Sequence, residues 1–148
     1  MKRALIAATL AACALALPGG AVAEGTGAHR IARLSGDGFQ EGDPNASGRT
    51  DLKIRPARGT ICFRITFKRM IDPNYGAILS GSLRYGGALE VTLFNGDRGM
   101  RPSPIEGCAR NLEPRLLRSI RDEPRRFYVQ IDQHSYANSA IRGRIRRP

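Results

Sequence analysis

Hydrophobic and polar residues alternate with a period of two along much of this chain, a pattern typical of half-buried β-strands. The clearest example is 61–68, where Ile61, Phe63, Ile65 and Phe67 share one face. Similar alternation predicts further strands at 29–34, 50–55, 77–83, 88–94, 127–132 and 139–145. Because the first of these alternates only weakly, we expect it at a sheet edge. Short strands separated by turn residues predict an antiparallel sandwich or barrel.

One helix is expected between the strands. Pro114 suits a first helical turn, and Leu116, Leu117 and Ile120 form a single apolar stripe. Pro124 ends the segment. A short helix of this kind is expected to cover one end of a β core.

The N-terminal segment is typical of a bacterial secretion signal. Lys2 and Arg3 precede an apolar stretch at 4–17, and the small residues at 21–23 suit signal peptidase. We expect cleavage before Glu24, which leaves 24–148 as a single exported domain, periplasmic or secreted. No other apolar run approaches the ~20 residues that cross a bilayer, so no transmembrane segment is expected after processing.

The same segment also matches a lipid-attachment signal, which is the alternative to cleavage before Glu24. Leu10-Ala11-Ala12-Cys13 matches a lipobox, in which Cys13 becomes the acylated first residue. Apolar residues continue at 14–17, where lipoproteins usually turn polar, so lipid anchoring is the less favoured interpretation.

Two cysteines remain after cleavage, Cys62 and Cys108. In an exported chain we expect them to form a disulfide. A metal site is the alternative, but neither cysteine has a histidine nearby in sequence.

An ordered set of short segments resembles the CHRD family, a domain first described in chordin and common in secreted bacterial proteins. The matching segments are Leu34-Ser35-Gly36, 60–65, 89–94, Gly107-Cys108, 116–120, 126–131 and 140–145. The resemblance spans about 29–146 and implies a Greek-key-like sandwich. The expected fold is therefore all-β, an antiparallel Greek-key-like β-sandwich with one short helix.

The chain departs from the family at its histidines. The family's Ala-His-Ile-His segment corresponds to Ala77, Ile78, Leu79 and Ser80, and a second common histidine position is occupied by Asp132. We therefore expect no metal and no cofactor, which disfavours a metal-dependent enzyme.

Catalytic patterns are weak elsewhere too. His29 and His134 have no nucleophile beside them in sequence, and Ser80 lacks the Gly-x-Ser-x-Gly pattern. With both thiols expected in a disulfide, a cysteine nucleophile is disfavoured. The sequence predicts a protein that is not an enzyme.

Arginine is the remaining unusual feature. The formal net charge of +11 falls to about +9 when Lys2 and Arg3 are removed. Guanidinium groups bind phosphates and carboxylates in bidentate fashion. The candidate anion-binding residues lie on the expected helix and on one face of the last strand: Arg115, Arg118, Arg121, Arg142, Arg144 and Arg146.

These features predict a noncatalytic binding or interaction module of the cell envelope. The favoured partner is anionic polysaccharide or lipid phosphate; a solvated arginine face without a ligand is the competing interpretation. The alternative function is assembly with another envelope protein through a strand edge. Nucleic acid is not expected, because the chain lacks an aromatic stacking platform. Salt dependence separates polyanion binding from edge pairing.

Overall fold

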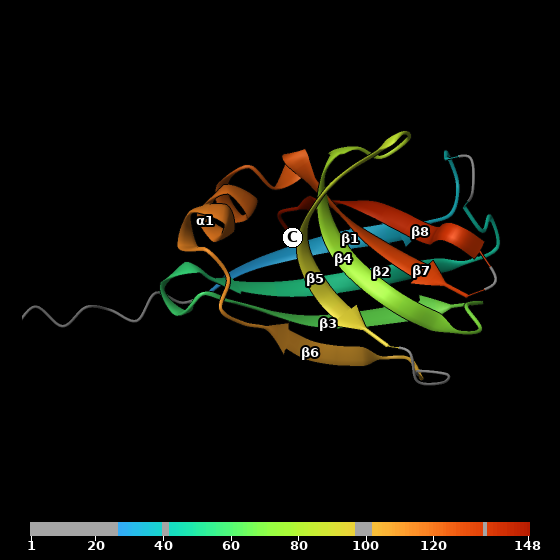
Figure 1. Ribbon diagram of the computed structural model, residues 1–148, viewed down its shortest axis with the longest axis horizontal. Helices are drawn as coiled ribbons and strands as arrows, with labels where there is room; N and C mark the ends of the chain where they lie inside the picture. The colour runs from blue at the N-terminus through green and yellow to red at the C-terminus, as the bar shows by residue number, and fades with distance from the viewer. Residues whose placement is uncertain (1–26, 40–41, 97–101, 135) are drawn as a thin grey trace, which may run out of the picture.

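Eight strands form one antiparallel sheet (Figure 1). This computed structural model describes residues 27–39, 42–96, 102–134 and 136–148, with the side chains of 136–139 excluded. The expected signal peptide at 1–23, including Cys13, lies outside the described residues. The strands are β1 (Ala28–Ser35), β2 (Ser47–Arg55), β3 (Thr60–Lys68), β4 (Pro73–Ser82), β5 (Gly86–Asn95), β6 (Ile105–Ala109), β7 (Phe127–Gln133) and β8 (Tyr136–Arg146).

The strand order in the sheet is β5-β4-β7-β8-β1-β2-β3-β6. The sheet rolls until its end strands, β5 and β6, approach one another, which nearly closes it. Around this ring β3 and β4 are consecutive in sequence but have β6 and β5 between them, a Greek-key-like connection. The all-β antiparallel fold class with one short helix is confirmed, and the two layers expected for a sandwich are opposite walls of one rolled sheet.

The inward faces of the strands form one hydrophobic core. Ile61, Ile65 and Ile141 are fully buried, as their alternation predicted. Phe63 of β3 and Phe94 of β5 bring opposite walls together, with ring centroids 6.4 Å apart. Burying each such side chain stabilises the fold by about 1.5–3 kcal/mol relative to exposure.

The expectation that the first strand lies at an edge is wrong. β1 pairs with β2 on one side and β8 on the other. Neighbouring residues Ile31 and Ala32 are both buried, so the two faces of this strand are both partly covered. A strand covered on both faces loses the clean alternation of apolar and polar residues, which explains its weak pattern.

Two further segments differ from expectation. The predicted strand at 77–83 begins earlier than expected: β4 starts at Pro73, because the first residue of a strand can lack an N–H donor. β6 was not expected as a strand. It is short and contains Gly107, where a Cβ would lie 2.8 Å from Cζ of Phe63. A glycine required by close packing weakens the local strand signal.

The α-helix of the described residues, α1 (Pro114–Asp122), lies at one end of the rolled sheet (Figure 1). Glu113 caps its N-terminus by accepting hydrogen bonds from the backbone N–H groups of Arg115 and Leu116, at 2.9 and 3.1 Å. Leu117 and Ile120 are fully buried, which confirms the predicted apolar stripe. Short 3₁₀ turns, η1 (Pro56–Arg58) and η2 (Pro124–Arg126), lie beside it. Within the described residues, no helix is long and apolar enough to cross a membrane.

Candidate anion-binding site

In the described part of the chain, a depression lined by cationic but no acidic side chains lies between β2, η1 and α1. It has a volume of about 580 Å³. We call it the basic basin after its five cationic lining residues, Lys53, Arg55, Arg58, Arg118 and Arg121. No residue that lines it, among those the structure describes, is acidic.

A tight turn brings the two sides of the basic basin together. Pro56 starts η1 directly after β2, and Gly59 ends it in the left-handed region, with φ 57°. The Gly59 carbonyl accepts a hydrogen bond from the N–H of Leu112 at 2.9 Å. Because Leu112 lies two residues before α1, this contact holds the turn that carries Arg58 beside the helix that carries Arg118.

Hydrogen bonds from β1 and within α1 hold the end of the helix that lines the basic basin. Arg30 of β1 donates through Nε to the carbonyl oxygen of Arg121 at 3.0 Å, which satisfies a carbonyl in the last turn of α1. The Arg121 guanidinium forms two bonds to Asp122, at 2.7 and 2.9 Å, and these bonds lower the pKa of that carboxyl. Burial, and then the charge of Arg147, lower the pKa of Arg30.

A second depression, of about 430 Å³, lies on the other side of Asp122. We call it the C-terminal basin. Its charged lining residues are Asp122, Glu123, Arg125, Arg126, Arg146 and Arg147. Both carboxylates already have a partner, since Arg126 donates to Glu123 at 2.9 Å and Arg121 to Asp122.

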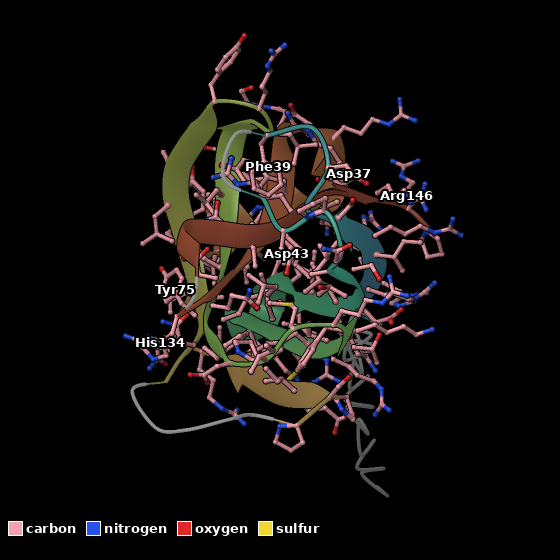
Figure 2. The ribbon with its side chains drawn as sticks, turned by 90° about the vertical axis from the view of Figure 1, so that its right-hand side faces the viewer. Asp37, Phe39, Asp43, Tyr75, His134 and Arg146 are labelled. Atoms are coloured by element: carbon pink, nitrogen blue, oxygen red, sulfur yellow. A yellow bond between two sulfur atoms is a disulfide. The ribbon has the colours of Figure 1, made fainter. Side chains whose placement is uncertain are left out.

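The arginines of β8 lie elsewhere and differ among themselves. Arg142 is half-buried, lies 4.5 Å from the Phe39 ring centroid and donates to the carbonyl oxygen of Leu83 at 3.0 Å. Arg144 lies 5.7 Å from the ring centroid of Tyr128, a residue that is fully buried. Figure 2 shows Phe39 within the loop after β1 and Arg146 projecting into solvent.

The six arginines expected to bind anions therefore do not form one site. Arg118 and Arg121 line the basic basin, and Arg146 lines the C-terminal basin. Arg115 is exposed near the start of α1 and lines neither of them. Arg142 and Arg144 pack against aromatic rings.

Three residues of the basic basin were missed from the sequence: Lys53, Arg55 and Arg58. The available signal was a run of basic residues around Pro56, at the end of a predicted strand. That signal does not indicate which other segment the turn will contact.

A third depression, of about 460 Å³, surrounds the predicted disulfide on the outer face of β2, β3 and β6. Cys62 and Cys108 are bonded, with an S–S distance of 2.10 Å, and lie directly opposite one another on β3 and β6. Lys53 lines this depression as well as the basic basin, but both acidic lining residues here have a basic partner: Arg49 contacts Asp51 at 2.9 Å, and Arg64 contacts Glu106 across the strands. This third depression therefore has paired acidic and basic side chains, whereas no acidic residue lines the basic basin.

The histidines have polar partners. The ring of His29 contacts Asp51 at 3.2 Å, and that of His134 lies 3.4 Å from the Asn74 amide. Ser80 donates its hydroxyl hydrogen to Glu90 at 2.6 Å. Among the residues that the structure describes, no three His, Cys, Asp or Glu side chains cluster in a way that could hold a metal ion.

Comparisons with protein-family models, with curated proteins and with solved structures gave no match.

Proposed function

We propose that this chain is an exported, noncatalytic binding module of the cell envelope, and that it binds anionic polysaccharide or lipid phosphate in the basic basin. The observation that carries the proposal is the convergence of five cationic side chains on one depression without an acidic lining residue in the described chain. The resemblance to the CHRD family and the N-terminal signal pattern support export to the compartment where such ligands occur.

Electrostatics favours an anionic occupant. Two like charges about 4 Å apart repel by about 1 kcal/mol even in bulk water, and by more near a protein surface. A bound phosphate, sulfate or carboxylate replaces that repulsion with charge-assisted hydrogen bonds. Because the basin is open to solvent, salt should screen the attraction strongly.

The test is binding of fluorescently labelled dextran sulfate, measured by anisotropy at about 50 mM and about 200 mM salt. We expect Arg118→Gln and Lys53→Gln each to weaken binding about five- to tenfold at low salt, and the higher salt to weaken wild-type binding steeply. Lys68→Gln is the matched control: Lys68 is exposed at the end of β3, lines no basin and carries the same charge. No binding at low salt, or equal losses in all three variants, would contradict the proposal.

A second candidate function rests on the end strand β5. Its only hydrogen-bonded neighbour in the described sheet is β4, and Leu89 is 57% exposed, with Tyr85 84% exposed at the preceding turn. An unpaired edge with apolar side chains suits strand addition by another protein. Association through this edge should persist at high salt and be lost in Leu89→Lys, measured by light scattering with envelope extract fractions.

A further inference from the structure

We infer that the basic basin and the C-terminal basin are two subsites for one linear polyanion with a negative group on successive repeat units. The inference rests on the proposed function and deepens it, because it distinguishes an extended chain from a single phosphate or sulfate group.

The two basins share a wall. Arg121 lines the basic basin, and its neighbour Asp122 lines the C-terminal basin. The bidentate contact between these two side chains neutralises the carboxylate of Asp122. No unpaired negative charge of this wall therefore separates the two subsites.

Positive charge continues across the wall. The register of β1 and β8 pairs Ile31 with Arg146, which places the end of β8 next to Arg30. Arg30 in turn contacts the carbonyl oxygen of Arg121 at the end of α1. Arg147 is close enough to act on Arg30 electrostatically. Cationic side chains thus run from one basin to the other over the end of α1.

Several of these cations remain available to a ligand. In the described part of the chain, no carboxylate lies within ion-pair distance of Arg118, Arg125, Arg146 or Arg147, which are all exposed. The first lines the basic basin and the other three line the C-terminal basin. Each subsite therefore contributes at least one exposed guanidinium that forms no ion pair with a carboxylate of the described residues.

Two adjacent subsites favour a chain over a monomer for an entropic reason. Once one part of a flexible polyanion occupies the basic basin, the next part is held near the C-terminal basin at an effective concentration in the millimolar range. Linking two weak sites in this way raises the overall affinity by about 10²–10⁴-fold without any new contact.

The experiment compares short and long probes of the same chemistry. Tripolyphosphate and long-chain polyphosphate form one pair, and trigalacturonic acid and a long oligogalacturonate form the other. Competition against labelled dextran sulfate gives each affinity for the wild type, Arg118→Gln, the double variant Arg125→Gln/Arg147→Gln and the control Lys68→Gln. The stronger pair identifies phosphate or carboxylate as the preferred group.

We expect the long probe to bind wild type and Lys68→Gln at least about tenfold more tightly than the short probe. The double variant should reduce this advantage to about threefold or less, because the basic basin alone cannot hold a second part of the long probe. Arg118→Gln should weaken both probes. Far-UV circular dichroism checks that each variant is folded.

Two results would overturn the inference. A length advantage that is the same in wild type and in the double variant would mean that the C-terminal basin takes no part, while the proposed function would survive through Arg118→Gln. Absence of binding by any probe to wild type would contradict both the inference and the proposed function.

Discussion

Arg142 of β8 forms a hydrogen bond with Leu83, in the turn between β4 and β5: its Nη1 donates to the Leu83 carbonyl oxygen at 3.0 Å. The same guanidinium lies 4.5 Å from the centroid of the Phe39 ring and 5.9 Å from that of Tyr128. Three surface segments that are distant in sequence therefore meet at one side chain: the loop after β1, the turn between β4 and β5, and β8.

This arrangement predicts a structural role for Arg142. Arg142→Met should lower the free energy of unfolding by about 1–2 kcal/mol, because it removes a hydrogen bond and two cation–π contacts. Arg146→Met is the control; its side chain is exposed and should change stability by less than about 0.5 kcal/mol. Urea unfolding measures both. Equal stability of the two variants would show that the Arg142 contacts contribute nothing.

Asp132 on β7 should make the stability of the protein depend on pH. Burial raises the pKa of its carboxyl to about 6, while Gln130 donates to it at 2.9 Å and Arg142 favours its ionised form. Tyr75 is its partner on β4. In the unfolded chain the pKa is about 3.9. Between these values the folded protein holds a proton that the unfolded chain has released.

The free energy of unfolding should therefore fall as pH rises from about 4 to about 6, and this contribution should stay lost above that range. Allowing for solvent screening, the loss is about 1–2 kcal/mol. Asp132→Asn should be more stable than wild type at pH 7 and lack this slope, since an asparagine oxygen still accepts from Gln130. Chemical unfolding across pH measures both proteins, and parallel pH profiles would contradict the assignment to Asp132.

The disulfide should contribute strongly to stability. Cys62 and Cys108 are separated by 46 positions, and closing such a loop stabilises a fold by about 4 kcal/mol in the chain-entropy model. The Cys62→Ser/Cys108→Ser variant should lose about 2–4 kcal/mol, measured by urea unfolding. In excess reductant, the free energy of unfolding of wild type should fall to that of the variant. If the reductant also lowered the stability of the variant, the effect would not come from this disulfide.

Gly59 links the stability of η1 to the basic basin. Its φ of 57° disfavours a side chain, and a Cβ there would lie 2.9 Å from the carbonyl oxygen of Leu112. Gly59→Ala should therefore cost about 1–2 kcal/mol of unfolding free energy and also weaken dextran sulfate binding, because Arg58 moves relative to Arg118. Gly38→Ala is the matched control, since Gly38 also has a positive φ, of 88°, but has no atom near its Cβ and lies away from the basin. Thermal unfolding and anisotropy separate the two effects; unchanged binding in folded Gly59→Ala would contradict the coupling.

Local patterns determined the parts of the fold that depend on a few neighbouring residues. The alternation at 61–68 predicted which side of β3 is buried, because successive side chains of a strand point to opposite faces. The stripe of Leu117 and Ile120 predicted the buried side of α1 for the same kind of reason. The Cys62–Cys108 pairing followed from there being two cysteines in an expected mature chain.

Tertiary structure decided which strand is an edge and where the cations meet. β1 lies between two strands because β8, more than 100 positions later, pairs with it. The basic basin joins Lys53, Arg55 and Arg58 to Arg118 through packing between distant segments, including the hydrogen bond between Gly59 and Leu112. The alternation of apolar and polar residues predicts which side chains of a strand are buried, but it does not predict which distant segment covers them. The pairing of distant segments depends on packing of the whole chain, and that packing assembled the basic basin from residues that the sequence keeps apart.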